Sequence, residues 1–432
     1  MKLIKNMFFV DLGQSRKLLI NTLNGRMDEI GHNVYDLIAS WQKCEDITPN
    51  SPDEVVLFKY LEANGYLVKD SNEEKAKKEE ILDVLRKNHS NNREKCKSIS
   101  FVMTYDCNFA CLYCFESGVE RKKAVITPAM IDAALELAGD EVESVLLFGG
   151  EPFLPETKPV VEYIMSKLPN ATYSAFTNGY YLESYVDLLS SVNVESIKVT
   201  LDGTEEVHDR RRPLLNGNPT FNEIINGISL CLNNNIPIAI KAVANKDTLD
   251  DCNHMCKYLQ DKFKQSELLT FAIGPEMAMS ENEKSDFLFD IFKSDIENLS
   301  LDTLDEFMAV NPAVRSIITS TPINPIYVHC IANENNFIFD PYGDLYTCLA
   351  SVGREQLKVG TYYPTVSFKE NSMYHRTIDS IPECQECAYS LLCGGGCPVA
   401  LSDYSNMFRP GCKVTKKRMH TLIPLCYNAM KK

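Results

Sequence analysis

The chain has 432 residues, of which 44% are apolar and 24% charged, and its 59 acidic and 44 basic side chains give a net charge of −15. This length predicts two or three domains, and the composition is that of a folded protein. An acidic surface repels phosphate, so we expect no nucleic-acid partner. No apolar run is long enough for a membrane span and no signal peptide is evident at the start, so we expect a cytoplasmic protein with no membrane partner.

Residues 1–70 are expected to form a winged-helix-like module. The Asn24-Gly25 pair is a hairpin signal, and Pro52 after Ser51 is typical of a helix start. Apolar residues at helical spacing predict an earlier helix, through Val34, Leu37, Ile38 and Trp41. Three strands are expected before the helices: Lys2–Val10, Lys17–Thr22 and Arg26–Ile30. The charged stretch 71–97 is interpreted as a linker.

Residues 98–274 alternate between strand-like and helical patterns, which predicts an α/β fold with a parallel sheet, open or curled into a partial (β/α)6 TIM barrel. In such sheets ligands bind beyond the carboxyl ends of the strands. Residues 275–325 are expected to form a helical bridging segment, and 326–432 a turn-rich region with eight of the 16 cysteines. The expected strands are Ser98–Thr104, Ser144–Phe148, Thr172–Phe176, Ser196–Leu201, Pro237–Val243 and Leu268–Ile273.

Three cysteines, Cys107, Cys111 and Cys114, follow the first of these strands within eight residues. In a reducing compartment such spacing favours metal binding over disulfides. Three thiolates can hold a 4Fe-4S cubane and leave one iron open to a small chelating ligand. A zinc knuckle is the alternative, but no further Cys or His lies within ten residues of this set.

The same loop resembles the radical SAM superfamily, because aromatic Tyr113 and Phe115 flank the third cysteine of a Cys-x3-Cys-x2-Cys motif. The resemblance implies that S-adenosylmethionine (SAM) chelates the open iron. One electron from the reduced cluster would then cleave SAM to a 5′-deoxyadenosyl radical. Cys107, Cys111 and Cys114 would accordingly be the catalytic cluster ligands.

Further SAM contacts are implied by the same resemblance. The sequence Gly149-Gly150-Glu151-Pro152 ends the second strand, where the family's glycine-rich motif meets the SAM amino group. Glycine suits such a site because a bare backbone allows a ligand to come close. For the Gly149–Pro152 segment, the alternative is a plain turn without a ligand. For Arg210–Arg212 it is a solvated basic run, and for Val243 it is an ordinary position in the core. The other implied SAM contacts are Tyr113, Phe115, Asn178, Thr200, Asp202, Arg212 and Val243.

The C-terminal cysteines resemble the SPASM domain, an extension that carries two auxiliary 4Fe-4S clusters in addition to the SAM-binding one. By position, Cys384, Cys387, Cys393 and Cys412 would hold one auxiliary cluster. The other would be held by Cys330, Cys348 and Cys397. Gly343 is expected in a hairpin turn between two of these ligands, where a positive φ favours glycine.

One ligand of the usual SPASM pattern is missing, because residues 321–329 contain no cysteine before Cys330. Cys426 is one candidate for the missing ligand. The alternative is an iron left open to a cysteine thiolate of the substrate. The remaining cysteines are mostly expected in the core, as small apolar residues: Cys44, Cys96, Cys231, Cys252 and Cys256.

The front module resembles the leader-recognition (PqqD-like) element of peptide-maturing radical SAM enzymes, in which a leader peptide adds a strand to the sheet. A DNA-binding winged helix is disfavoured because the module shows no dense basic stripe. The resemblance over nearly the whole chain implies a peptide maturase of the sactipeptide or ranthipeptide type, which forms thioethers. Its partners would be a precursor peptide with a leader and an electron donor such as flavodoxin or ferredoxin.

Three other functions remain open at this stage. An anaerobic sulfatase-maturing enzyme, which makes formylglycine, is disfavoured because Leu349 stands where that branch carries an aspartate base. Carbon–carbon cross-linking of peptides is not excluded. An iron–sulfur redox-sensing regulator is the non-enzymatic alternative, although a sensor has no use for SAM contacts.

Overall fold

The computed structural model describes residues 1–114, 116, 124–276, 283, 287, 311–401 and 403–431. These residues fall into two compact units. The first unit contains both ends of the chain, with described residues 1–91, 311–333 and 375–431, and the second contains residues from 92–287 together with 334–374. The front module therefore shares a unit with much of the C-terminal cysteine region.

The second unit is built on six parallel strands in sequence order, as the alternating pattern predicts. Along most of these strands, buried side chains alternate with half-buried ones, so one face of the sheet is more deeply buried than the other. The α/β expectation is confirmed. The strands are β6 (Ser98–Val102), β7 (Ser144–Phe148), β8 (Thr172–Thr177), β9 (Asn193–Thr200), β10 (Ile238–Ala244) and β11 (Leu269–Pro275).

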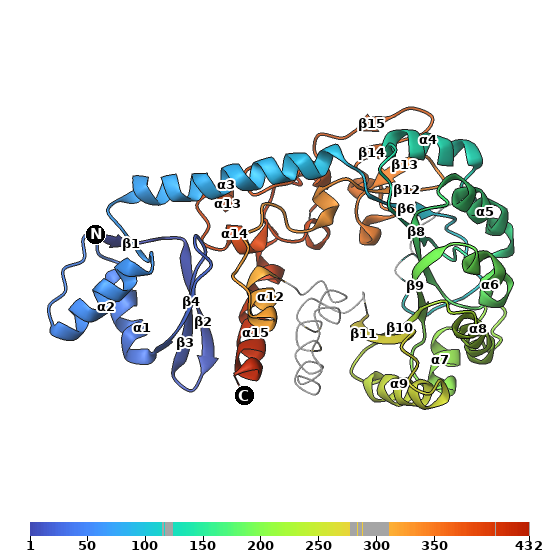
Figure 1. Cartoon of the computed structure of the whole chain (residues 1–432), viewed down its shortest axis with the longest axis horizontal. Coiled ribbons are helices and arrows are strands. Elements are labelled where there is room, and N and C mark those ends of the chain that lie inside the picture. Colours follow the sequence, from blue (N-terminus) through green and yellow to red (C-terminus); the bar gives the residue numbers. More distant parts are fainter. Residues whose placement is uncertain are drawn as a thin grey trace. The chain divides into compact units, whose positions relative to one another are not determined.

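Helices connect these strands and lie along the outer side of the sheet (Figure 1). The first of them begins where the sequence predicts, since Pro128 is its first residue and the Thr127 side chain accepts a hydrogen bond from the Met130 backbone N–H. The helices are α4 (Pro128–Ala138), α5 (Lys158–Lys167), α6 (Leu182–Ser190), α7 (Glu205–Arg211), α8 (Phe221–Asn233) and α9 (Leu249–Lys262).

Four short strands from the C-terminal part extend the same sheet, which the sequence analysis did not anticipate. Strand β12 (Asn336–Phe339) pairs parallel with β6, and the other three follow in antiparallel order: β13 (Asp344–Tyr346), β14 (Gly360–Thr361) and β15 (Ser367–Phe368). Gly343 lies in the β12–β13 turn with a φ of 81°, as expected. A Cβ there would lie 2.1 Å from the Tyr363 carbonyl oxygen, so the turn also needs glycine for space.

The front of the first unit has the expected antiparallel sheet, of β2 (Met7–Gly13), β3 (Arg16–Asn21) and β4 (Met27–Gly31). Two helices follow, α1 (His32–Trp41) and α2 (Pro52–Ala63). The expected first strand is interrupted: β1 (Lys2–Leu3) pairs instead with β5 (Leu67–Val68). The break occurs because the Glu74 carboxylate accepts the backbone N–H groups of Lys5 (2.6 Å) and Asn6 (2.9 Å), which a continuous strand would have used for pairing.

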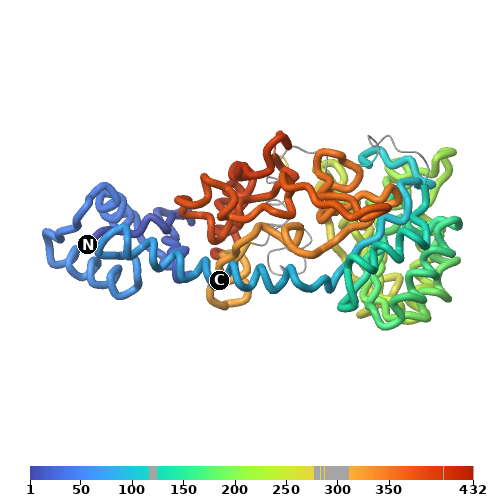
Figure 2. The backbone as a smooth tube through the Cα atoms, turned by 90° about the horizontal axis from the view of Figure 1, so that it is seen from above, coloured from blue at the N-terminus to red at the C-terminus, as the bar shows by residue number. Residues whose placement is uncertain are grey.

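The stretch interpreted as a linker is almost entirely one helix, α3 (Ser71–Glu94), as Figure 2 traces. Its charged composition concealed a narrow buried face, on which Leu82 packs with Ile378 and Ile381. Polar contacts add to this docking, since Lys78 donates to the Gln385 carbonyl at 2.5 Å. A loose connection is therefore ruled out for this part of the first unit.

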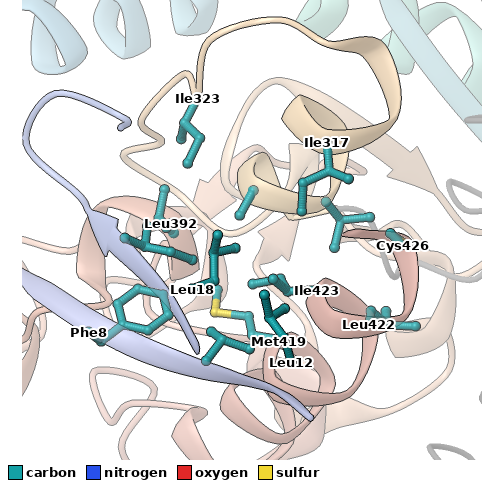
Figure 3. Close-up of a cluster of buried hydrophobic side chains, with 14 of the residues drawn as sticks. Phe8, Leu12, Leu18, Ile317, Ile323, Leu392, Met419, Leu422, Ile423 and Cys426 are labelled. Carbon is teal, nitrogen blue, oxygen red and sulfur yellow. The ribbon is translucent and has the colours of Figure 1, made fainter. Parts of the chain in front are cut away.

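The last helix, α15 (Cys412–Met430), packs against β2 and against α12 (Pro312–Thr319) in one apolar core. Figure 3 shows this core, with Phe8, Leu12 and Leu18 from the front sheet, Ile317 from α12, and Met419, Leu422, Ile423 and Cys426 from α15. Of the expected bridging segment 275–325, α12 is helical and most of the remainder lies outside the described residues.

The other elements are short. They are α13 (Pro382–Gln385), α14 (Ser390–Cys393) and the 3-10 turns η1 (Pro155–Thr157), η3 (Ile331–Asn333), η4 (Leu349–Ser351), η5 (Glu355–Leu357), η6 (Met373–His375) and η7 (Pro398–Ala400). Within the described residues, no helix combines the length and the apolar character that crossing a bilayer requires.

Candidate functional site

The cysteine loop, residues 107–114, follows β6 and is held in place by the segment after α7. The backbone N–H groups of Ala110 and Leu112 donate to the carbonyls of Pro213 (2.8 Å) and Arg211 (3.1 Å). The arginine-containing segment therefore runs beside the cysteines. The sequence separates these two segments by about a hundred residues, and the barrel brings them together.

The cysteines of this loop differ in exposure: Cys107 and Cys111 are half-buried, and Cys114 is exposed. Burial, followed by the negative charge of Glu151, raises the pKa of Cys107 to about 12. Burial also raises the pKa of Cys111, which lies within electrostatic range of Cys114 and of Arg212. Bound iron would displace the thiol protons. In the described part of the chain, no three Cys, His, Asp or Glu side chains are close enough to chelate one metal ion. A four-iron cluster holds its thiolates farther apart than a single ion does, so a cluster on Cys107, Cys111 and Cys114 stays a prediction.

Gly149 and Gly150 pack directly against the entry to the cysteine loop. A Cβ on Gly149 would lie 2.3 Å from the Thr104 carbonyl oxygen, and one on Gly150 would lie 2.3 Å from the Asp106 carbonyl oxygen. The structure thus gives a reason for the glycines that the sequence analysis did not: they let two backbones meet. The expectation that SAM approaches the bare backbone of Gly149 and Gly150 stays a prediction.

Glu151 is a buried carboxylate at the end of β7. It accepts hydrogen bonds from the Thr177 hydroxyl (2.6 Å) and from the backbone N–H groups of Asn178 (2.7 Å) and Phe153 (2.9 Å). Burial raises the pKa of Glu151 to about 7, although these hydrogen bonds favour the ionised form. A buried carboxylate of this kind suits a cationic group of a ligand.

Asn178 connects β8 to the cysteine loop. Its side-chain N–H donates to the Asn108 side-chain oxygen at 2.7 Å and lies 3.8 Å from the Cys107 sulfur. Asn178 was predicted as a SAM contact, whereas Asn108 was not singled out. The Asn178 amide can therefore orient the first cysteine directly.

Tyr113, Asp202, Arg212 and Val243 meet at one point, as the prediction of a common site requires. The Tyr113 hydroxyl donates to the Asp202 carboxylate and accepts from the Arg212 guanidinium at 2.5 Å. The Val243 backbone N–H donates to the other Asp202 oxygen at 2.9 Å. Arg212 Nε is buried and has no hydrogen-bond partner among the described residues, so it can still donate to a ligand.

Arg211 is a member of this network that the sequence analysis missed. Its guanidinium donates to the Glu276 carboxylate (2.9 Å) and the Val243 carbonyl (3.0 Å), and lies 4.8 Å from the centre of the Tyr113 ring. Both Arg211 and Arg212 are buried, so the solvated-run alternative is wrong for them, and only Arg210 is exposed. No local signal in the sequence distinguishes the three arginines.

The other predicted positions have simpler surroundings. Thr200 is half-buried at the end of β9, beside Lys241 of β10, and Phe115 lies outside the described residues. His208 accepts from the Asp202 backbone N–H at 3.1 Å, and the Asp209 carboxylate accepts from the Phe221 backbone N–H at the start of α8 (2.9 Å). These last two contacts are structural.

Four of the C-terminal cysteines lie in one neighbourhood of the first unit. Burial, followed by the charges of neighbouring thiolates, raises the pKa of Cys393 to about 12 and that of Cys384 to about 11. In both cases the neighbours include Cys387 and Cys412. This is the set predicted for one auxiliary cluster. Of the second set, Cys330 and Cys397 belong to the first unit and Cys348 to the second.

Cys426, the candidate for the missing ligand, is buried in the structure. It is 1% exposed within the apolar core around α15 (Figure 3), and burial raises its pKa to about 11. The proposed ligand Cys393 is buried in the same core, so the suggestion that Cys426 supplies the missing ligand stays a prediction. Of the other unassigned cysteines, Cys96, Cys231 and Cys252 are buried as expected, Cys256 is half-buried and Cys44 is exposed.

Comparison with known proteins agrees with this geometry. Residues 101–259 match the family model of the radical SAM superfamily. The chain is 23% identical over 372 residues to the radical SAM cyclopropyl synthase TigE of Paramaledivibacter caminithermalis, a match that covers 78% of this chain and 76% of that protein.

Two solved structures share the fold. Native anSMEcpe with bound AdoMet aligns with a TM-score of 0.58 at 19% identity, covering 78% of this chain and 99% of that one. Streptococcus suis SuiB bound to its precursor peptide SuiA aligns with a TM-score of 0.53 at 15% identity, covering 96% of this chain and 99% of that one. The motif, the barrel and the family match agree, and residues 101–259 of this chain form a radical SAM domain.

Proposed function

We propose that this protein is a radical SAM peptide maturase that installs thioether cross-links in a ribosomally made precursor peptide. When bound, the cluster on Cys107, Cys111 and Cys114 would supply the electron that splits SAM into methionine and a 5′-deoxyadenosyl radical. The observation that carries the proposal is the buried network of Tyr113 and Arg212, which joins the cysteine loop to the strand ends.

The residues of the network suit the parts of SAM by charge. Glu151 offers a buried carboxylate to the SAM ammonium group, and the free Nε of Arg212 offers a donor to the SAM carboxylate. Asp202 holds Tyr113 and the Val243 backbone, so its role is to position the others. Thr200 and Phe115 remain proposed SAM contacts on the resemblance alone.

A peptide substrate is supported by the front module. Strand β4 is the outer strand of its sheet and pairs only with β3 among the described strands, so its other edge can accept an added strand. The likeness to SuiB bound to a precursor peptide extends over 96% of this chain, front module included. We therefore propose a leader-bearing precursor peptide as the partner, with an external electron donor such as flavodoxin or ferredoxin.

Thioether formation is supported by the ligand count of the second auxiliary set. Cys330, Cys348 and Cys397 would leave one iron without a protein ligand, unless Cys426 supplies it. A substrate thiolate could occupy that position. Each cross-link forms one sulfur–carbon bond and removes one hydrogen from carbon and one from sulfur, so the peptide loses two hydrogens.

Carbon–carbon bond formation is the second candidate. The similarity to a cyclopropyl synthase over 78% of this chain favours it. The two products lose the same number of hydrogens but differ in thiol content. A thioether consumes a cysteine thiol, whereas a carbon–carbon bond leaves every thiol free to react with iodoacetamide.

The test uses a cysteine-containing precursor peptide, to be sought as a small open reading frame beside this gene, incubated without oxygen with reconstituted enzyme, SAM and dithionite. The proposal predicts a mass loss of two hydrogens per cross-link and one fewer alkylatable thiol for each. Unchanged thiol content with the same mass loss would favour carbon–carbon bonding. A formylglycine product would instead place the enzyme with the sulfatase-maturing branch. No peptide modification, with SAM still cleaved, would overturn the substrate assignment.

A further inference from the structure

Arg376 is a fully buried arginine in the first unit, and the proposed chemistry assigns it no role. Its guanidinium donates hydrogen bonds to backbone carbonyls only. The acceptors are Gly395 (2.5 Å), Gly396 (2.6 Å), Arg409 (2.7 Å) and Met407 (3.0 Å). A planar group with several fixed donors can hold separate backbone segments together in this way.

These carbonyls belong to the two loops that carry proposed auxiliary ligands. Gly395 and Gly396 lie between Cys393 and Cys397, and the other two acceptors lie shortly before Cys412. Gly395 has a φ of 86°, and a Cβ there would lie 2.6 Å from Ile381 Cδ1 and 3.2 Å from Arg376 Nη1. Glycine at this position therefore makes room for both the Ile381 side chain and the guanidinium.

A third segment meets the same turn. A Cβ on Gly394 would lie 2.3 Å from the backbone carbon of Val328. His329 pairs its Nδ1 with the Cys393 carbonyl oxygen at 2.9 Å. The residues directly before Cys330 are thus packed on the glycine turn, so Arg376 and this turn organise three cysteine-bearing segments.

The charge of Arg376 has no carboxylate partner among the residues that the structure describes. Burial opposes the charge of Arg376 and lowers its pKa. The groups that favour the charged form are the thiolates of Cys384, Cys393, Cys397 and Cys330. A buried cation without a counter-charge is strongly destabilising. Cys384 and Cys393 belong to one proposed auxiliary set, and Cys397 and Cys330 to the other. Iron–sulfur clusters on these thiolates would be anionic and would supply the missing charge.

We propose that Arg376 is a positioning residue of the auxiliary-cluster region, which fixes the ligand loops and balances the negative charge of the cluster they hold. The inference rests on the proposed auxiliary clusters. A reduced cluster has one more negative charge than an oxidised one, so the fixed positive charge of Arg376 would favour reduction. Removal of the charge is expected to shift the auxiliary reduction potential to more negative values.

The test places Arg376→Gln and Arg376→Lys in a full-length C107A/C111A/C114A background, where any bound iron belongs to auxiliary sites. Iron and sulfide content and the midpoint potential from an EPR-monitored titration are measured after anaerobic reconstitution. R376Q is expected to lose most of the iron, or to keep it at a more negative potential. R376K, which retains the charge, is expected to stay closer to the parent. Arg315→Gln, an exposed arginine on α12, is the control and should match the parent.

The outcomes separate this inference from the proposed function. A parent without iron would contradict the auxiliary clusters themselves. If the parent binds iron and R376Q has the same iron content and midpoint potential as the parent, the role of Arg376 is overturned. The same holds if R376K and R376Q behave alike. If R376Q does not fold, R376K decides: retention of auxiliary iron at the parent potential supports the inference, and loss of that iron contradicts it.

Discussion

Tyr113 is the side chain that couples the cysteine loop to the barrel. Its hydroxyl lies between the Asp202 carboxylate and the Arg212 guanidinium, and the Arg211 guanidinium lies over its ring. Burial, with Asp202 acting against Arg212, raises the pKa of Tyr113 well above its ordinary value. The phenol is therefore a neutral bridge between two charged groups at the proposed SAM site.

Removal of that bridge should impair SAM cleavage. Tyr113→Phe deletes two hydrogen bonds to charged partners, each worth about 1.5–3 kcal/mol, so we expect 5′-deoxyadenosine formation to fall by about tenfold or more. The assay is SAM cleavage under dithionite without peptide. Tyr163→Phe is the matched control, since its hydroxyl bonds Asp132 at the surface. Equal rates for Y113F and the parent would show that the bridge is dispensable.

His208 gives a second prediction at the residue scale, on stability. Burial, followed by the nearby Arg212 and Arg211 charges, lowers the pKa of His208 well below its ordinary value. Below about pH 6.5, the unfolded chain therefore binds one more proton at this histidine than the folded chain does. The contribution of neutral His208 to the free energy of unfolding is complete above that pH. It is lost as the pH falls, by up to about 1.4 kcal/mol per pH unit.

The variant His208→Gln should accordingly be less stable at pH 7.5 but lose less stability between pH 7.5 and 5.5 than the parent. Urea unfolding of the apoprotein at both values measures this difference. His254→Gln, at an exposed position, should keep the parent's dependence. A pH dependence unchanged by H208Q would mean that the histidine is protonated in the folded state.

At the scale of elements, the end of β7 and the cysteine loop form one packed unit. Gly150→Ala would place a methyl group 2.3 Å from the Asp106 carbonyl oxygen and 2.7 Å from that of Tyr105, neither of which is a flexible side-chain end. We expect the loop to shift and the variant to bind less iron at the SAM-binding site. Iron content and SAM cleavage are the measurements.

Gly31→Ala is the control for this change, because no atom lies within 4 Å of a Cβ there. It should retain the parent's iron and rate. If G150A also retains both, the close approach of the two backbones does not constrain the loop.

Helix α3 supports the loop of Cys384 through the buried face around Leu82. Leu82→Ala removes a side chain that is 6% exposed, so we expect a loss of about 2–4 kcal/mol in the free energy of unfolding of the first unit. Val84→Ala on the same helix, 59% exposed, should cost less than about 0.5 kcal/mol. Chemical denaturation of the apoprotein compares them, and equal effects would contradict the docking of α3.

Elements were predictable from the sequence where one physical signal dominated. The six parallel strands follow from the alternation of strand-like and helical patterns, and the start of α2 follows from Ser51 and Pro52. Helix α3 was missed because charge on its exposed face outweighed a narrow apolar stripe. The hairpin turn at Gly343 was expected, but the extension of the sheet through β12–β15 was not, because these strands have only two to four residues each and β12 pairs with β6, which is distant in sequence.

At the site, Tyr113, Asp202 and Arg212 could be identified through the family resemblance, and the structure brings them together. Arg211 and Glu276 could not, since their pairing joins the ends of two elements and leaves no local pattern. Arg376 was missed for a related reason: its partners are backbone carbonyls, which the sequence does not mark.

At the scale of the whole molecule, the two ends of the chain share a core. Strands β2 and β3 and helix α15 bury the same apolar cluster (Figure 3), so the front module and the last helix stabilise each other. Peptide recognition and the auxiliary set of Cys384, Cys387, Cys393 and Cys412 would therefore reside in one unit, and the proposed SAM site in the other. The second auxiliary set takes Cys330 and Cys397 from the first unit and Cys348 from the second. The sequence predicts each module but not this partition.

The measurement closest to the central claim is SAM cleavage by the anaerobically reconstituted chain with dithionite. The account predicts 5′-deoxyadenosine and methionine in equal amounts, and no cleavage by the C107A/C111A/C114A variant. A protein that carries its full complement of iron and sulfide but leaves SAM intact, or a variant that cleaves SAM as fast as the parent, would contradict the account.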